Sequence, residues 1–406
     1  MYIYHNKIII TMVDKVLTEV RTRLVLGKAP ISSCRSNKVP YNFDDLNFVP
    51  ASLKKRPVDY FRENIYSDTI IGKTSEHPLK LKTPIIFAGM SFGALSKEAK
   101  IALARASSII GTVANTGEGG MLPEERKEAK LLIAQYSTAR FGVDEKYIKS
   151  ADAIEIKIGQ GAKPGQGGLL PKEKVTKEIA KVRKLKKIDD IHSPPYHPDI
   201  KSLKDLKNKV EWLRNLTKGK PIILKLGSFT KEDFKIALKA GPDVIAIDGM
   251  RGGTGAAPEI MLNDFGTPII PSLVEARKIM RKAKASQDLI VGGGFNKGPD
   301  VAKALALGAD GVFMGTSLLV AMGCMQCRQC YKGICPIGIT TQDPKLRSKF
   351  NMKKAVNGLV NYVRACTEEV KMAAGACGYK NIHMLNRKNL ISLTEKISIA
   401  TGIPMI

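Results

Sequence analysis

The sequence predicts an α/β fold: a (β/α)8 TIM barrel with an N-terminal lead-in and a C-terminal helical tail. Two observations support this. From about residue 80, short β-branched apolar runs alternate with stretches of helical period, which indicates βαβ units and a parallel sheet. Nearly every run then passes directly into glycine or polar residues, as the ligand-binding loops at the mouth of a barrel do. An open, doubly wound sheet is the alternative, but its ligand site is a single crevice.

Eight segments have the length and composition of barrel strands, and helix-period stretches such as KEAKIALARAS and GPDVAKALALG lie between most of them. We expect an N-terminal extension over residues 1–50, the barrel over 51–345 and a C-terminal helical segment over 346–406. The predicted strands cover residues 84–88, 111–115, 153–158, 221–226, 243–247, 267–270, 288–291 and 311–314.

Composition and charge restrict the classes of function. The apolar runs are far shorter than the roughly 20 residues that span a bilayer, and the start MYIYHNKIII is a poor signal peptide. We therefore expect no membrane segment and a cytoplasmic location. The net charge of +27 would attract nucleic acid or an acidic partner. The lysines are spread along the chain without a basic arm, so an RNA-binding protein on a retained barrel is only a distant alternative.

Four of the seven cysteines fall within twelve residues, as Cys324-x2-Cys327-x2-Cys330-x4-Cys335-Pro336. Thiolates at this spacing suit an iron–sulfur cluster, whereas a zinc site more usually has two separated pairs. We predict that these four cysteines bind metal. The other three, Cys34, Cys366 and Cys377, show no such spacing, and we expect them to pack as ordinary side chains.

The strand ends carry further candidates. Glycines after the last two strands, Gly293, Gly294 and Gly315, are typical of the phosphate cradle of TIM barrels, with Thr316 beside them. A lysine in an apolar strand is costly unless it meets an anion or a cofactor dipole. Both Lys157 and Lys225 are placed in this way, and Lys163 follows in a loop fixed by proline and glycine.

Taken together, these segments resemble the FMN-binding (synthase) domain of the glutamate synthase large subunit, in a stand-alone, archaeal-like form. The resemblance is collinear from about Tyr41 to near the C-terminus. The matching strings are GMSFGALS (89–96), NTGEGG (115–120), EIKIGQGAKPGQGG (155–168), SPPYHPDIKSLKDL (193–206), DGMRGGTGAAP (248–258) and CMQCRQCYKGICPIGITTQD (324–343).

The resemblance implies a flavin- and iron–sulfur-dependent oxidoreductase. Ammonia and 2-oxoglutarate would form 2-iminoglutarate, which reduced FMN converts to glutamate. Catalytic roles would fall on Lys157, Glu118 and Lys163. The 2-oxoglutarate site would map onto Lys163, Arg183 and Ser202. The FMN contacts would be Ser91, Lys157, Gly293, Gly294, Gly315 and Thr316. The alternation of side chains in a barrel strand would also place Lys225 in the lumen, facing the flavin.

Several positions depart from the family pattern. In the family three cysteines bind a [3Fe–4S] cluster, matched by Cys324, Cys330 and Cys335, whereas Cys327 offers a fourth thiolate and hence [4Fe–4S]. Leu169 stands where a glutamine is usual, and Met250-Arg251 where His-Asp is common. A related FMN and iron–sulfur barrel enzyme acting on another 2-oxo acid or amine is therefore the alternative. An α-hydroxyacid oxidase is disfavoured, because those enzymes need no cluster.

The resemblance also implies partners. The family's amidotransferase domain begins with a cysteine, whereas this chain begins Met1-Tyr2, so we expect ammonia from solution or from a separate glutaminase subunit. No second strand–GxGxxG–helix unit follows the barrel, so we expect electrons from a ferredoxin or another electron-donor subunit. An oligomer is expected.

Overall fold

The computed structural model describes residues 17–405, and it confirms the TIM barrel. Eight parallel strands form one sheet in the order β5-β15-β14-β12-β11-β8-β7-β6. The backbone N–H of Phe87 in β5 donates to the carbonyl of Val113, just before β6, at 3.1 Å, so the first and last strands meet and the barrel is nearly closed. The strands are β5 (Ile85–Phe87), β6 (Ala114–Asn115), β7 (Leu132–Tyr136), β8 (Ala153–Lys157), β11 (Ile222–Leu226), β12 (Val244–Asp248), β14 (Asp288–Gly292) and β15 (Gly311–Met314).

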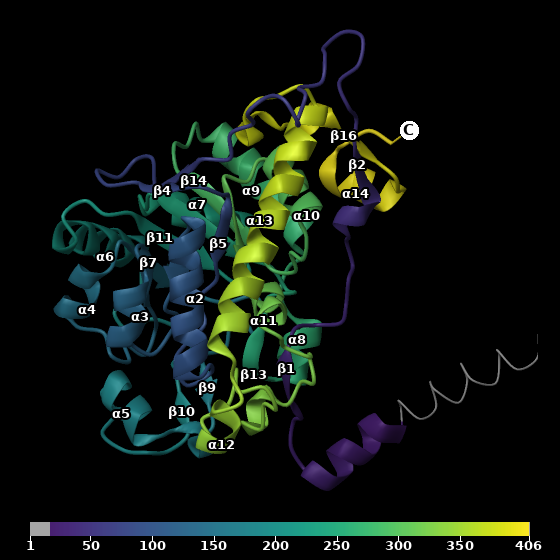
Figure 1. Ribbon diagram of the computed structural model, residues 1–406. Helices are drawn as coiled ribbons and strands as arrows, with labels where there is room; N and C mark the ends of the chain where they lie inside the picture. Colours follow the sequence, from purple (N-terminus) through teal and green to yellow (C-terminus); the bar gives the residue numbers. More distant parts are fainter. Residues whose placement is uncertain (1–16, 406) are drawn as a thin grey trace, which may run out of the picture.

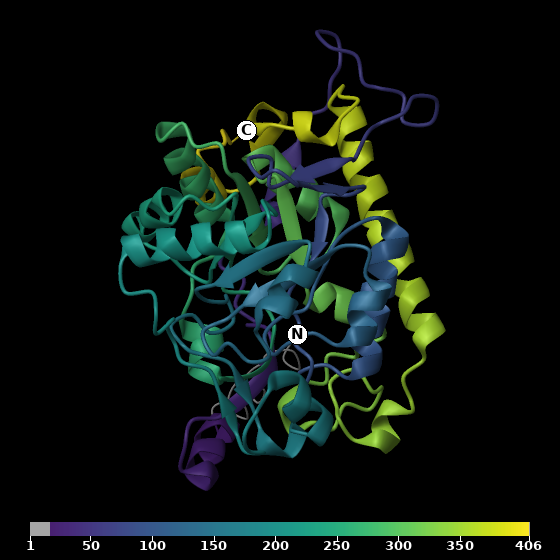
Figure 2. The same ribbon diagram turned by 90° about the vertical axis from the view of Figure 1, so that its left-hand side faces the viewer.

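Helices surround the barrel, and the long helix α13 (Met352–Ala376) of the predicted C-terminal tail runs beside α2 (Lys97–Ile110) in both views (Figures 1 and 2). The tail is thus packed onto the barrel wall, and Glu369 of α13 accepts the backbone N–H of Gly298 at 2.8 Å. The other helices of the outer ring include α3 (Pro123–Glu128), α4 (Glu145–Ser150), α6 (Leu203–Leu216), α7 (Lys231–Lys239), α9 (Ile269–Lys282), α10 (Gly298–Leu307) and α11 (Thr316–Ala321).

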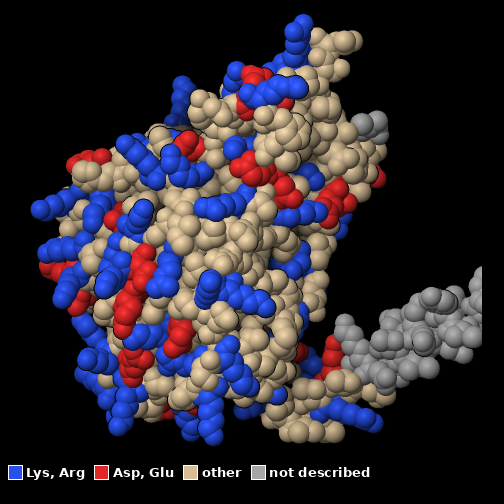
Figure 3. Space-filling model, viewed as in Figure 1, with Lys and Arg blue, Asp and Glu red and all other residues tan. Residues whose placement is uncertain are grey.

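The surface carries the large positive charge in a dispersed form. On the face shown in Figure 3, Lys and Arg side chains are scattered among Asp and Glu rather than gathered in one patch. None of the helices in residues 17–405 is long and apolar enough to cross a membrane.

The strands are buried on both faces, as expected for a parallel sheet covered by helices. All five residues of β11 are buried. Ile223 packs inside the barrel with residues such as Val244 and Ile290, whereas Ile222 and Leu224 belong to the layer between barrel and helices. Successive side chains of each strand therefore point alternately into the barrel and toward the helices. The strand ends remain free to continue into loops.

The predicted strand over residues 267–270 is wrong. Pro268 instead precedes α9, and Ile269, Ile270, Leu273 and Ala276 form the buried face of that helix. The eighth strand is β7 (Leu132–Tyr136), which the sequence reading missed. The physical reason is the short connection before it, since α3 has only six residues and gives little helical periodicity to separate two strands.

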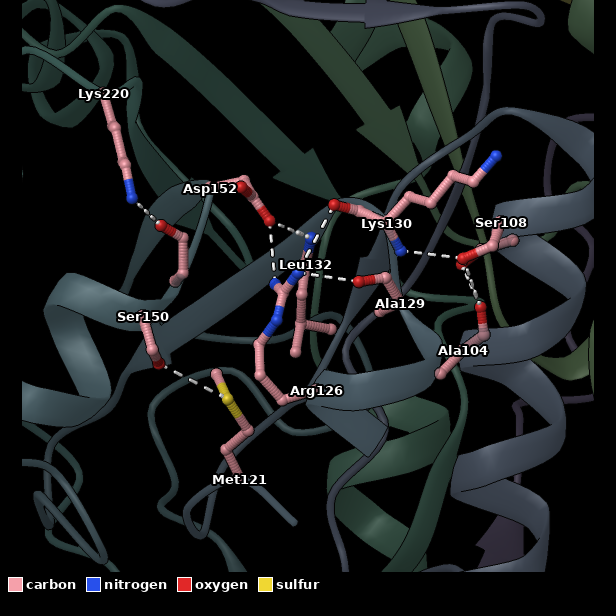
Figure 4. A network of polar contacts seen from close by, with 12 residues as sticks. Ala104, Ser108, Met121, Arg126, Ala129, Lys130, Leu132, Ser150, Asp152 and Lys220 are labelled. Carbon is pink, nitrogen blue, oxygen red and sulfur yellow. Dashed lines mark hydrogen bonds and ion pairs between the residues drawn. The ribbon is translucent and has the colours of Figure 1, made fainter. Parts of the chain in front are cut away.

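The start of β7 is fixed by polar contacts that come from outside the strand (Figure 4). Asp152 accepts the backbone N–H of Leu132 and the guanidinium of Arg126, each at 2.8 Å. The hydroxyl of Ser108, on α2, accepts the N–H of Lys130 at 2.7 Å. These side chains satisfy the backbone at the bottom of the barrel and set where the strand begins.

Both ends of the chain add small sheets. Strand β1 (Ile31–Cys34) pairs antiparallel with β13 (Thr254–Pro258), which lies in the loop after β12, so the N-terminal part reaches the mouth of the barrel. Strand β16 (Leu390–Ser392) pairs with β2 (Leu46–Phe48), and β3 (Thr69–Ile71) pairs with β4 (Leu79–Leu81). The helix over residues 17–26 projects from the body (Figure 1).

Candidate active site

A cavity opens at the carboxyl ends of the barrel strands. It has about 1580 Å³ of empty space, the solvent at its mouth included. Loops after most of the strands contribute to its wall, which is where TIM barrels place ligands and reacting groups. The predicted site residues that line it are Ser91, Glu118, Lys157, Lys163, Arg183, Lys225, Gly293, Gly294, Gly315, Thr316, Cys324 and Cys330.

The predicted phosphate cradle forms one wall. Gly293 and Gly294 have φ angles of +103° and +107°, which side chains other than glycine rarely adopt. A Cβ on Gly293 would lie 2.6 Å from the carbonyl oxygen of Gly249, so this turn has no room for a side chain. Gly315 and Thr316 follow the adjacent strand β15. The wall therefore presents bare backbone to the cavity.

Lys157 and Glu118 form an ion pair on another wall, with 2.9 Å between Nζ and Oε2. Both side chains are largely buried. Ser193 donates its hydroxyl to the other oxygen of Glu118. Burial alone would raise the pKa of Glu118, but the charge of Lys157, the hydrogen bonds from Ser193 and Lys157, and the charge of Arg183 outweigh it and lower that pKa to about 2. Glu118 is therefore a carboxylate at neutral pH.

Lys225 is buried in the floor of the cavity. It pairs with Glu155 at 2.6 Å, and Asn115 and Gln135 donate to the same carboxylate at 2.9 and 2.6 Å. Burial disfavours its charge, but Glu155 and Asp248 outweigh burial and raise the pKa of Lys225. The ion pair with the hydrogen-bonded carboxylate of Glu155 offsets the cost of burying the charge of Lys225, which explains how a lysine is tolerated in an apolar strand.

Lys163 and Arg183 have no carboxylate partner among residues 17–405. Lys163 donates only to the carbonyl of Ala256, at 2.9 Å, and Arg183 donates to the carbonyl of Phe92, at 2.8 Å, while its buried Nε has no partner. Burial, with the charge of Lys157, lowers the pKa of Lys163 to about 7. Burial lowers the pKa of Arg183 to about 10. The charge of Glu118 acts on both cations through space, but no carboxylate in the described part of the chain forms an ion pair with either, which makes this wall suited to an anion.

The structure does not bring Ser202 to this cavity. Ser202 is exposed and is the N-cap of α6, where its hydroxyl accepts the backbone N–H of Asp205 at 3.2 Å. Its side chain is used by the helix, and it does not lie with Lys163 and Arg183.

The cysteine loop follows α11 and reaches the same cavity. Cys324 and Cys330 line it, Cys335 is buried, and Cys327 is exposed outside the lining. Lys174 ties this loop to the barrel by donating to the carbonyls of Cys330 and Thr340, at 3.2 and 3.0 Å. In the described part of the chain, no three Cys, His, Asp or Glu side chains converge on the position of one metal ion.

Cys34 was expected to pack as an ordinary side chain, but it lies in the cavity wall against Cys330. A hydrogen bond between the two thiols, with burial, raises the pKa of Cys34, and the same bond lowers the pKa of Cys330 to about 6. Almost 300 residues separate the two cysteines, and they meet because β1 pairs with β13 and also contacts the cysteine loop, where the hydroxyl of Ser33 accepts the N–H of Tyr331 at 2.9 Å. No local spacing could have indicated this contact.

Arg35, Asp248 and Arg251 also line the cavity and were not predicted as site residues. Asp248 ends β12 and accepts the N–H of Gly161 at 2.9 Å, which fixes the loop before Lys163. Arg251 follows in the next turn. Asp248 ends a strand, as Lys157 does, so the same feature of the sequence could have identified it.

Comparison with known proteins identifies the family. The model of the conserved region in glutamate synthase matches residues 28–380. This chain belongs to the glutamate synthase family. A glutamate synthase large subunit-like protein of Rhizobium meliloti is 37% identical over 97% of this chain and 94% of its own length. An archaeal glutamate synthase [NADPH] of Archaeoglobus fulgidus is 44% identical over 77% of this chain but only 62% of its own length. An archaeal-type glutamate synthase [NADPH] of Thermotoga maritima is 38% identical over 88% of this chain and 76% of its own length.

Solved structures agree on the fold of this glutamate synthase family member. A mandelate oxidase with an FMN adduct superimposes with a TM-score of 0.53 at 19% identity, covering 87% of this chain and 89% of the oxidase. A flavocytochrome b2 gives a TM-score of 0.57 at 18% identity, covering 91% of this chain and 82% of its own. At this identity the likeness supports the barrel architecture alone.

Proposed function

We propose that the chain is the catalytic subunit of a flavin- and iron–sulfur-dependent glutamate synthase, which converts 2-oxoglutarate and ammonia to glutamate. One observation carries the proposal: in a member of this family, two buried cations that form no ion pair within residues 17–405, Lys163 and Arg183, share a cavity with a glycine-walled cradle. The cations suit a dicarboxylate, and the cradle suits a cofactor phosphate.

The residues of the cavity fit FMN. Its empty space exceeds the roughly 300–1,000 Å³ of typical ligand pockets, which leaves room for a cofactor and a substrate together. Ser91, Gly293, Gly294, Gly315 and Thr316 would hold the flavin, with the lysines of β8 and β11 (Lys157 and Lys225) beside its ring. FMN would supply the hydride that reduces the imine. A fixed cation in the floor, such as Lys225, favours negative charge on a neighbouring group.

Lys163 and Arg183 would bind the two carboxylates of 2-oxoglutarate. Because burial and the charge of Lys157 lower the pKa of Lys163 to about 7, a fraction of this lysine is neutral at pH 7 before substrate binds. An incoming carboxylate raises that pKa again, so substrate binding is coupled to uptake of a proton. Glu118 stays ionised and can accept a hydrogen bond from ammonia or from the imine N–H. Lys157 would contribute to catalysis indirectly, because its ion pair with Glu118 keeps that carboxylate ionised.

The cysteine loop is proposed to hold an iron–sulfur cluster through Cys324, Cys330 and Cys335. In such a cluster each thiolate binds its own iron, so the sulfur atoms surround a space and need not converge on one point. Cys34 is better placed than the exposed Cys327 to offer a fourth thiolate, because it touches Cys330 in the cavity wall. The cluster would be [3Fe–4S] with three ligands and [4Fe–4S] with four.

Partners are also proposed. Ammonia would come from solution or a separate glutaminase subunit, and electrons from a ferredoxin or another donor subunit. The net charge of +27 would attract an acidic donor and speed its association. The relatives of Archaeoglobus fulgidus and Thermotoga maritima have [NADPH] in their names, and the chain covers 62% of one and 76% of the other.

A second candidate is favoured by Leu169, an apolar residue in the cavity lining where the family usually has glutamine. It would suit a 2-oxo acid with a less polar side chain.

Anaerobic purification followed by flavin, iron and sulfide assays tests the cofactors, with one FMN and three to four irons per chain expected. Amination of a panel of 2-oxo acids with an artificial reductant then tests the substrate. Turnover of 2-oxoglutarate above all others supports the proposal, and preference for an apolar 2-oxo acid would replace it with the second candidate.

A further inference from the structure

Two arginines at the glycine-walled end of the cavity, Arg35 and Arg251, belong neither to the proposed substrate site nor to the proposed cluster loop. Arg251 lies in the turn after β12, and Arg35 follows β1 in the N-terminal part of the chain. Both line the cavity. A Cβ on Gly294 would lie 3.1 Å from the Cβ of Arg251, so this arginine rises directly beside the cradle.

Neither arginine forms an ion pair with an acidic residue in the described part of the chain. No described Asp or Glu lies within ion-pair distance of the half-buried Arg35 or Arg251, whereas the buried Lys100 and Lys225 each have a carboxylate partner, at 2.8 and 2.6 Å. The buried Nε of Arg251 has no hydrogen-bond partner at all. Burial lowers the pKa of Arg251, and the charge of Arg35 lowers it further, while the charge of Asp300 offsets part of this. Both arginines line the cavity beside the loop of Gly294, so an anion bound at this loop would lie within the positive field of both.

Arg35 is held in position from the cradle loop. It donates to the side-chain oxygen of Asn296 at 2.7 Å, and Asn296 in turn donates to the carbonyl of Gly294 at 2.8 Å. The N-terminal segment is therefore braced against the loop after β14. This leaves further guanidinium N–H groups of Arg35 free for a ligand.

The position of the two arginines beside the glycine turn indicates which kind of anion they would bind. Strands β12, β14 and β15 are consecutive in the sheet, and the loops that follow them carry Arg251, Gly294 and Thr316. The cations assigned to substrate lie elsewhere: Lys163 follows β8, and Arg183 is in α5 (Lys177–Arg183). Backbone N–H groups of a glycine turn together with two guanidinium forks match the oxygens of a phosphate monoester.

We propose that Arg35 and Arg251 bind the phosphate of the flavin mononucleotide, so that the N-terminal segment completes the cofactor site. The inference rests on the proposed function, and it fixes the direction of the cofactor, with the phosphate at the β12–β15 side and the ring toward Lys157 and Lys225. It also distinguishes FMN from riboflavin, because riboflavin lacks the phosphate but shares the ring and the ribityl chain.

The test compares FMN with riboflavin. The full-length chain is freed of flavin, and both ligands are titrated by quenching of flavin fluorescence. Loss of a hydrogen bond to a charged group weakens binding about tenfold or more. Arg35→Gln and Arg251→Gln should therefore each raise the Kd for FMN at least about tenfold and leave the Kd for riboflavin within about twofold. Arg35→Lys and Arg251→Lys keep the charge and should lose less.

Arg364→Gln is the matched control, since Arg364 is exposed on α13 and should change neither Kd. Inorganic phosphate should compete with FMN for the wild type and compete less for the two glutamine variants. Unchanged FMN binding in both glutamine variants, or an equal loss of FMN and riboflavin, would overturn the inference while leaving the proposed function standing. A wild-type chain that binds neither flavin would overturn both.

Discussion

Replacing Lys100 with methionine tests how the loops of the cavity are held. Lys100 is buried in α2, where it pairs with the buried Glu125 at 2.8 Å and donates to the carbonyls of Met90 and Thr116 at 2.6 and 2.8 Å. Those carbonyls belong to the loops after β5 and β6, and Gly117 packs against the backbone of Met90 between them. One ammonium group therefore joins two walls of the site from below.

The substitution leaves the carboxylate of Glu125 buried without its cation, which costs about 3–5 kcal/mol. With an unfolding entropy of about 2.1 cal/mol/K per residue over 406 residues, this corresponds to a fall in Tm of about 4–6 °C. Differential scanning calorimetry measures it. Because the loops would lose their common anchor, flavin should also dissociate faster from Lys100→Met than from the wild type.

A matched exposed pair provides the control. Lys149 and Glu145 are paired at 2.7 Å with side chains that are 54% and 67% exposed, so Lys149→Met should change Tm by less than about 1 °C. The double variant Lys100→Met/Glu125→Gln removes the stranded charge and should recover part of the loss. A Lys100→Met protein as stable as Lys149→Met would refute the reasoning, since it would mean that the buried pair does not support the fold.

Three further predictions concern the site. Lys163→Met should raise the KM for 2-oxoglutarate at least about tenfold. In the wild type, the same KM should be constant below pH 7 and rise above pH 7, because only the protonated lysine binds the carboxylate and the pKa of Lys163 is about 7. An unchanged pH profile in Lys163→Met would count against this assignment. Glu118→Gln should lower kcat by about tenfold or more in steady-state assays and leave FMN content unchanged, because the carboxylate pairs with Lys157 and is proposed to contact substrate, not the cradle. Full activity would exclude the role. Cys330→Ser should lose most of its iron by colorimetric assay and Cys327→Ser should keep it, and equal losses would instead make the exposed cysteine a ligand.

Much of the site could be predicted because its residues follow strand ends. Lys157, Lys163, Glu118 and the glycines of the last two loops all reach the cavity for that reason. Ser202 was assigned from resemblance, although Ser followed by Asp three positions later is also a helix N-cap pattern, and the structure uses it in that way.

The remaining site residues depend on long-range pairing. Cys34 and Arg35 reach the cavity because β1 pairs with β13 more than 200 residues later, and no periodicity within 31–34 indicates that partner. The strand β7 was missed and residues 267–270 were misassigned for a related reason. Two apolar residues beside a proline fit a strand and the first turn of a buried helix equally well, and only tertiary packing separates them.

A single-turnover experiment tests the central claim most directly. The enzyme-bound flavin is reduced anaerobically, and its absorbance is followed after 2-oxoglutarate, ammonia or both are added. The account predicts reoxidation only when both are present, with one glutamate formed per flavin. Flavin that stays reduced in the presence of both, or that is reoxidised by the 2-oxo acid alone, would contradict it.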